Sequence, residues 1–139
     1  MSLGLSEWYS PAAPGTGLHP RPREAAELRT YVPECSDDWQ SIYYPTRKGE
    51  DVTGLHDRSY EVLRALIPTV EHKYGGKHQR ILLVSHAAPI IGLARVLVGD
   101  RALPLRIGTC SITELKPKDT SSNAVGNWVA TKLGDGSHL

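Results

Sequence analysis

The chain has 139 residues, of which 40% are apolar and 22% are charged, a composition typical of folded globular proteins and not of disordered ones. This length suits one domain or a piece of one. The net charge is only +1 and the basic residues are scattered, which argues against direct binding of nucleic acid.

The two cysteines, Cys35 and Cys110, stand far apart and outside any Cys-x-x-Cys or Cys/His spacing. This favours free thiols in a reducing compartment over a disulfide framework or a zinc site. No stretch reaches the roughly 18 apolar residues of a membrane-spanning helix, and the N-terminus lacks the pattern of a signal peptide. We therefore expect a protein of the cytoplasm or the nucleus that makes no membrane contact.

Proline and glycine punctuate the N-terminal third of the chain, which predicts loops with one short helix opening at Pro22–Arg29. In residues 55–74 apolar side chains recur with helical spacing, and Gly75 and Gly76 end the pattern. Pro68 lies inside this segment and lacks a backbone donor. A kink or a broken helix is therefore expected there.

The second half of the chain predicts a strand, a helix and a strand pair. Ile81–Val84 is an unalternating apolar run, which indicates a strand buried on both faces of a parallel sheet. Residues 88–98 predict an apolar helix that ends at Gly99. Thr109–Leu115 and Trp128–Leu133 alternate and predict two paired strands. This order of elements is that of an α/β domain.

His86 is the first candidate for chemistry, because it follows the predicted strand and precedes a helix. In α/β sheets ligands bind at this end of the strands, and the N–H groups of a helix N-terminus favour an anion. A histidine there could hold a phosphate or act as an acid or base near neutral pH. The alternative is that His86 only satisfies nearby backbone groups.

Glu7 is the second candidate and stands beside Trp8 and Tyr9. If the aromatic rings remove its carboxyl group from water, Glu7 could act as a general acid. The alternative is an ordinary surface charge.

The segments GLSEWYSP, ILLVSHAAPIIGLARVLVGD and NWVATKLGDGSHL resemble, in this order, segments of the histidine phosphatase superfamily. They are similar to the family's acidic-residue segment, its second-histidine motif and its closing strands. GLSEWYSPAAPGTGLHPRP, YYPTRKGE and LHDR resemble more narrowly fungal members, some of which belong to RNA polymerase III transcription factor IIIC. The resemblance implies a partial phosphoglycerate-mutase-like α/β three-layer sandwich.

The resemblance also implies hydrolysis of phosphomonoesters through a phosphohistidine, without cofactor or metal. The substrate would be a phosphorylated small molecule or a phosphoprotein. His86 corresponds to the second histidine of the phosphate pocket, with Ala87 beside it, and Glu7 corresponds to the proton donor. Arg58 is the arginine that could partly complete the pocket, or it is a solvent-facing helix residue.

One departure from the family pattern limits this interpretation. No Arg-His dipeptide occurs in the 139 residues, so the nucleophile motif is absent. We therefore expect residues 1–139 to form a single, incomplete domain that lacks the first strand and is inactive alone. Unpaired strand edges would make it marginally stable or lead it to pair with another chain. The alternatives are a non-catalytic interaction module with a protein partner in a transcription complex, and an α/β fragment without function.

Overall fold

The computed structural model describes residues 2–36, 38–75, 77, 80–119 and 124–139. Within these residues the elements are a 3-10 helix, three α-helices and two strands: η1 Leu3–Leu5, α1 Ala25–Leu28, α2 Val52–Tyr74, α3 Ala87–Val98, β1 Ile112–Pro117 and β2 Trp128–Asp135.

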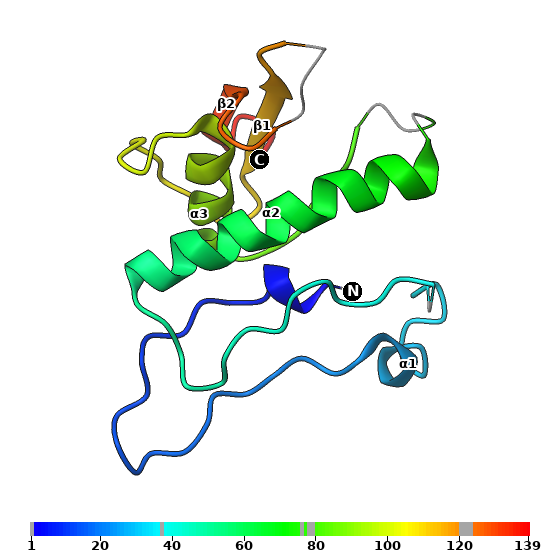
Figure 1. The fold of residues 1–139 in the computed structure, drawn as a ribbon, viewed down its shortest axis with the longest axis vertical. Coiled ribbons are helices and arrows are strands. Elements are labelled where there is room, and N and C mark those ends of the chain that lie inside the picture. Colours follow the sequence, from blue (N-terminus) through cyan, green and yellow to red (C-terminus); the bar gives the residue numbers. More distant parts are fainter. Residues whose placement is uncertain (1, 37, 76, 78–79, 120–123) are drawn as a thin grey trace.

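The long helix α2 separates the molecule into two parts (Figure 1). On one side it packs against α3, which in turn carries the β1–β2 hairpin, and on the other side it contacts η1. The N-terminal loops and α1 lie beyond η1. Over the described residues no helix, α2 included, has the length and apolar character needed to cross a membrane.

The apolar core lies between α2 and α3. Leu63 of α2 packs with Leu93, Val96 and Leu97 of α3, and all four are buried. Trp128 of β2 and other half-buried residues of the hairpin cover this cluster from the side opposite α2. The hairpin thus covers one side of a small core.

The strand pair confirms the expected closing hairpin. β1 and β2 run antiparallel, with Pro117 opposite Trp128 and Ile112 opposite Asp135. Inner residues of β1 alternate with exposed ones, as the sequence pattern predicted. Helices together with this antiparallel pair give the partial α/β fold that the sequence indicated.

The helix predicted from residue 55 begins three residues earlier, at Val52. Asp51 caps it by accepting a hydrogen bond from the Gly54 N–H (2.7 Å). A kink or a broken helix was expected at Pro68, and the broken helix is wrong, because α2 continues through this residue. Pro68 is exposed, so water can solvate the carbonyl group that lost its partner. Gly75 adopts a left-handed conformation (φ +51°) and ends the helix; Gly76 lies outside the described residues.

The strand expected at Ile81–Val84 is also wrong. These residues run from α2 toward α3 without pairing to a strand, since the sheet formed by the described residues contains only β1 and β2. Leu82 is 85% exposed and Val84 is 82% exposed. A strand buried on both faces needs a neighbour at its edge, and none of the described segments takes that place.

His56 is a buried histidine on α2 whose Nε2 has no hydrogen-bond partner in the described structure. Burial lowers its pKa below the ordinary value of 6.5, and the charges of Arg101 and Arg95 lower it further. The folded protein therefore keeps this ring neutral at a pH at which the unfolded chain already takes up a proton.

We expect His56 to make the free energy of unfolding depend on pH. Because the unfolded state binds the proton first, stability is highest above about pH 6.5 and falls as the pH drops toward the lowered pKa of the folded state. Each unit of pKa shift corresponds to about 1.4 kcal/mol. Urea denaturation between about pH 5.5 and 8 measures this dependence. As the pH falls, the free energy of unfolding should decrease less for His56→Gln than for the wild type.

His72→Gln is the matched control, because His72 is an exposed histidine of the same helix. Its free energy of unfolding should depend on pH as that of the wild type does. An equal pH dependence for the wild type and His56→Gln would contradict the role of His56.

Candidate functional site

His86 stands at the junction between segment 81–85, which has no regular secondary structure, and α3. It is the N-cap residue of the helix, in an extended conformation (φ −106°, ψ 169°), and Ala87 is the first helical residue. The first N–H groups of an α-helix have no acceptor within the helix and remain available for an anion. The sequence placed both residues at a helix N-terminus, and the structure does the same.

The structure brings Glu7 and His86 together from positions 79 residues apart. His86 Nδ1 lies 3.1 Å from Glu7 Oε2, and both side chains remain partly open to solvent, at 58% and 37% exposure. The other carboxylate oxygen, Oε1, accepts a hydrogen bond from the Trp8 N–H (2.7 Å). The two oxygens of the Glu7 carboxyl group thus face different partners, the His86 ring and the Trp8 backbone.

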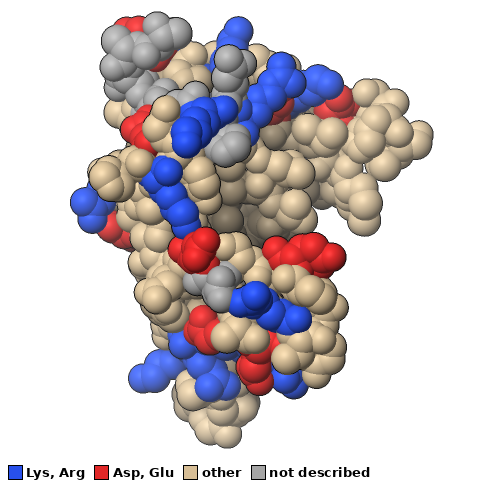
Figure 2. All heavy atoms as spheres, turned by 90° about the vertical axis from the view of Figure 1, so that its right-hand side faces the viewer, with Lys and Arg blue, Asp and Glu red and all other residues tan. Residues whose placement is uncertain are grey.

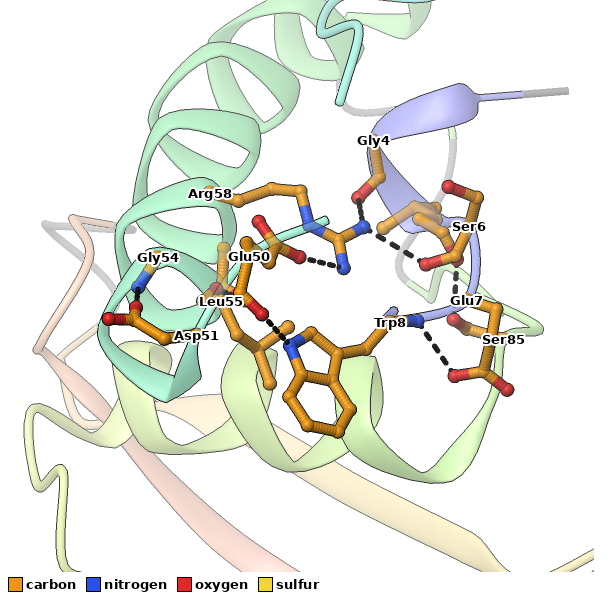
Figure 3. Close-up of polar contacts among 12 residues, drawn as sticks. Gly4, Ser6, Glu7, Trp8, Glu50, Asp51, Gly54, Leu55, Arg58 and Ser85 are labelled. Carbon is orange, nitrogen blue, oxygen red and sulfur yellow. Dashed lines mark hydrogen bonds and ion pairs between the residues drawn. The ribbon is translucent and has the colours of Figure 1, made fainter. Parts of the chain in front are cut away.

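Three successive carbonyl groups before Glu7 are held from two other segments (Figure 3). Arg58 Nη1 donates to Gly4 O (3.1 Å) and Ser6 O (2.9 Å), and Ser85 Oγ donates to Leu5 O (2.6 Å). Ser85 directly precedes His86 in the chain. The contacts that hold the backbone of residues 4–6 thus also position Glu7 relative to His86.

Arg58 is buried, with 2% of its surface exposed, so the expected alternative of a solvent-facing helix residue is wrong. Its Nη2 lies 2.7 Å from Glu50 Oε1, an ion pair that is not aligned as a hydrogen bond, while Nε has no partner. The Glu50 carbonyl in turn accepts from the Trp8 indole N–H (2.9 Å; Figure 3). These contacts occupy the guanidinium group within the chain, and its predicted contact with phosphate stays a prediction.

Sequence reasoning missed Ser85 and Glu50. Ser85 had a usable signal, because it adjoins the candidate histidine. Glu50 comes eight residues before Arg58, across the start of a helix, and no helical or strand spacing links two such positions.

The described residues hold no group of three or more His, Cys, Asp or Glu side chains placed to bind a metal ion. What the arrangement offers is a carboxyl group and an imidazole 3.1 Å apart, next to the N–H groups of a helix. Such a set can bind an anion and move a proton to or from it.

The chain is similar to known proteins. Residues 19–129 match the model of the histidine phosphatase superfamily (branch 1), which is well over half of the chain. The chain belongs to the histidine phosphatase superfamily. The matched region contains His86, Ala87 and Arg58 but begins after Glu7, whose correspondence to the family's acidic residue therefore rests on the GLSEW segment alone.

The chain is also similar to a curated protein of Saccharomyces cerevisiae, the transcription factor tau 55 kDa subunit. The two are 30% identical over 122 residues, which is 81% of this chain and 27% of the relative. The chain thus spans about a quarter of that protein. The narrower resemblance to a fungal transcription factor subunit is confirmed.

We expect the Arg58–Glu50 pair to control stability as a unit. Arg58→Met leaves the half-buried Glu50 charge without its partner and two carbonyl groups without a donor, which should lower the free energy of unfolding by about 3 kcal/mol. Adding Glu50→Gln to that variant removes the orphaned charge and should restore part of the loss. Urea unfolding followed by tryptophan fluorescence measures all the variants.

The exposed pair Arg64–Glu61 of α2 provides the control, with Nη2 2.8 Å from Oε2. Arg64→Met should cost less than about 1 kcal/mol, because water screens that pair. If the effects of Arg58→Met and Glu50→Gln simply added, the two groups would not be coupled.

Proposed function

We propose that this chain contributes one wall of the phosphate pocket of a histidine phosphatase. The observation that carries the proposal is the 3.1 Å contact between Glu7 and His86, two residues that the family resemblance assigns to one pocket. In this pocket the His86 imidazolium donates a hydrogen bond to a phosphoryl oxygen, and the N–H of Ala87 provides a second donor. Donors fixed around the phosphoryl group stabilise the charge that develops during transfer.

Glu7 is proposed as the acid for the leaving group. In the structure its carboxylate is occupied by His86, so a substrate phosphate that binds His86 would free one oxygen of Glu7. When protonated, this oxygen gives its proton to the ester oxygen as the P–O bond breaks, and the product leaves as a neutral alcohol. The phosphoryl group passes to a nucleophile at the same time.

The nucleophile is proposed to come from residues outside this sequence. The Arg-His motif that carries it in the family does not occur among the 139 residues. Residues 1–139 would then act as part of a larger domain and show no phosphatase turnover alone.

The proposal predicts weak phosphate binding at the Glu7–His86 pair in the 139-residue chain. Titration with inorganic phosphate, followed by amide NMR signals, should shift the resonances of residues 7, 86 and 87. His86→Ala removes a charge-assisted hydrogen bond and should raise the apparent Kd about tenfold. His72→Ala, which removes an exposed histidine from α2, should leave the Kd unchanged.

The same sample should produce neither p-nitrophenol from p-nitrophenyl phosphate nor an acid-labile phosphoprotein. Phosphate binding that survives His86→Ala intact would contradict the pocket. A phosphorylated histidine in this chain would contradict the assignment of the nucleophile to other residues.

We also propose a protein-binding role, because one surface is unusually apolar. Ile81, Leu82 and Val84 are exposed, and next to them lies an apolar groove of about 320 Å³. Its lining consists of seven apolar or aromatic residues and two polar ones: Leu5, Trp39, Leu66, Val70, Tyr74, Ile81, Leu83, Ser2 and Arg80. On the side of the molecule where α2 ends, Figure 2 shows a hollow walled mostly by uncharged residues. Adjacent exposed apolar residues of this kind mark interaction sites.

The partner is proposed to belong to a transcription factor complex in the nucleus. This rests on the relative, which is a subunit of transcription factor tau. Segment 81–84 would pair with an edge strand of that partner. Backbone N–H and C=O groups that lack partners can form hydrogen bonds with a strand of another chain.

Leu82→Lys should abolish this association without unfolding the chain, because exposed substitutions change stability by only about 0.5 kcal/mol. The measurement is a pull-down from yeast nuclear extract with the tagged chain, in which subunits of transcription factor tau are identified by mass spectrometry.

Leu18→Lys serves as the control, because Leu18 is an exposed apolar residue of the N-terminal loops. Loss of the tau subunits with Leu82→Lys and their retention with Leu18→Lys is the expected result. Equal recovery with both variants would show that segment 81–84 is not the contact surface.

A further inference from the structure

The segment that follows Glu7 carries a Ser-Pro pair, Ser10 and Pro11, and no other proline of the chain follows a serine or a threonine. Residues 7–13 form neither helix nor strand, and both members of the pair are exposed. Proline restricts the residue before it to extended conformations. Ser10 therefore lies on an accessible, extended stretch of chain, where an enzyme that modifies serine side chains can reach it.

Hydrogen bonds hold the backbone on both sides of Ser10 against a second loop. The Tyr9 carbonyl accepts from the Glu50 N–H (2.9 Å), and the Ala12 N–H donates to the Lys48 carbonyl (2.8 Å). Both partners belong to residues 48–50, which are distant in the sequence. Ser10 thus has a defined place although its segment has no regular secondary structure.

His19 and Gly49 adjoin the carbonyl group of Ser10. His19 Nε2 lies 2.9 Å from Ser10 O and is the donor, because a carbonyl oxygen can only accept. The His19 ring also stacks on Tyr9, with the ring centres 4.7 Å apart. A Cβ at Gly49 (φ +81°) would overlap the Ser10 carbonyl oxygen. The two loops therefore meet closely at Ser10.

The Ser10 hydroxyl group, in contrast to the carbonyl, has no hydrogen bond among the described residues. The facing loop carries two cations, Arg47 and Lys48. Arg47 is joined to His19 in both directions, since its Nε donates to the His19 carbonyl (2.8 Å) and its own carbonyl accepts from the His19 N–H (2.8 Å). Arg47 is thus tied to the residue that also contacts Ser10.

These two cations have no anion to balance them. Arg47 and Lys48 are exposed, and neither takes part in an ion pair among the described residues. The carboxyl groups of Glu7 and Glu50, on the same two segments, already have other partners. An anion added at Ser10 would therefore meet positive charge that no described carboxyl group pairs.

We propose that Ser10 is a phosphorylation site for a proline-directed protein kinase and that Arg47 and Lys48 of the facing loop bind the resulting phosphate group. Such kinases select proline at the position after the acceptor, where its lack of a backbone N–H distinguishes it from other residues. Phosphorylation adds a charge of about −1.5 to −2 and three acceptor oxygens. Guanidinium and ammonium groups bind such a group through charge-assisted hydrogen bonds.

The reaction transfers the γ-phosphoryl group of ATP. The Ser10 Oγ attacks the γ-phosphorus, the bond between that phosphorus and the β–γ bridging oxygen breaks, and ADP leaves with the electron pair. The hydroxyl proton passes to the catalytic aspartate of the kinase. The chain contributes only the acceptor hydroxyl group, which has no hydrogen bond within the described structure to lose.

The phosphate would also act on the candidate site, an effect that rests on the proposed function. Ser10 follows Glu7 by three residues, and a chain spans at most about 3.6 Å per residue, so the two Cα atoms lie within about 11 Å of each other. Over such a distance two anions repel each other, and salt weakens the repulsion. Phosphorylation of Ser10 would thus lower the affinity of the Glu7–His86 pair for phosphate.

The first experiment incubates the 139-residue chain with ATP, Mg²⁺ and a cyclin-dependent kinase, which is a proline-directed enzyme. We expect one phosphoryl group per chain, located on Ser10 by tandem mass spectrometry. Ser10→Ala should abolish this modification and Pro11→Ala should remove most of it. Ser137→Ala, which changes an exposed serine followed by histidine, should keep it. An unmodified Ser10, or equal phosphorylation of Pro11→Ala, would overturn the proposal.

The second experiment measures the second pKa of the Ser10 phosphate by phosphorus NMR. Its ordinary value is about 6, and neighbouring cations lower this pKa because they favour the dianion. We expect the pKa to be about 0.5 lower in the phosphorylated chain than in a phosphorylated peptide of residues 7–13, which lacks the facing loop. Equal pKa values in chain and peptide would overturn the binding of the phosphate by the loop.

Arg47→Gln/Lys48→Gln should return this pKa to the value of the peptide. The control Arg106→Gln/Lys116→Gln removes the same charge from two exposed residues elsewhere, after α3 and on β1, and should leave the pKa lowered. The same pKa in both double variants would overturn the role of Arg47 and Lys48.

Titration of both forms of the chain with inorganic phosphate tests the effect on the candidate site. The phosphorylated form should bind about threefold more weakly at low salt, and the difference should decrease at about 0.15 M salt. Equal affinities would overturn this effect. If neither form shows binding that depends on His86, the proposed phosphate pocket fails and the effect fails with it, whereas mass spectrometry still decides on the modification of Ser10.

Discussion

The candidate site depends on one buried cation, the guanidinium group of Arg58. It is removed from water, paired with Glu50 and directed at the carbonyl groups of Gly4 and Ser6. A buried charge is costly unless it is paired and hydrogen-bonded. Moving the N-terminal segment away from α2 would remove two hydrogen-bond acceptors from Arg58 and is therefore unfavourable. This constraint places Glu7, which has no regular secondary structure of its own, at a defined distance from His86.

A site built in this way has a rigid frame and open reacting groups. Arg58 and Glu50 are withdrawn from solvent, whereas Glu7 and His86 are partly exposed and meet across two segments that each have a separate anchor. The anchors fix the backbone, while the two side chains stay free to exchange partners. That combination suits a site in which a ligand must displace an internal contact, because rearranging a side chain costs far less than moving buried backbone.

The sequence predicted the helices, the hairpin and the place of His86 before a helix because each depends on local patterns or on a motif. The resemblance assigned Glu7 and His86 to one pocket but did not predict the contact between them. Helical spacing and Gly99 predicted the end of α3, and alternation predicted the hairpin.

Arg58 was misread because an arginine on a helix is usually solvated, and its burial depends on Glu50 and on carbonyl groups over fifty residues away. Ile81–Val84 was misread because its apolar run matches a buried strand, yet burial also requires neighbours, which sequence pattern does not provide.

The exposed segment 81–84 leads directly into Ser85 and His86, so a partner strand that orders this segment would also steady the histidine. Under the two proposals, protein association and phosphate binding would therefore be coupled through Ser85 and His86, and the partner would strengthen phosphate binding.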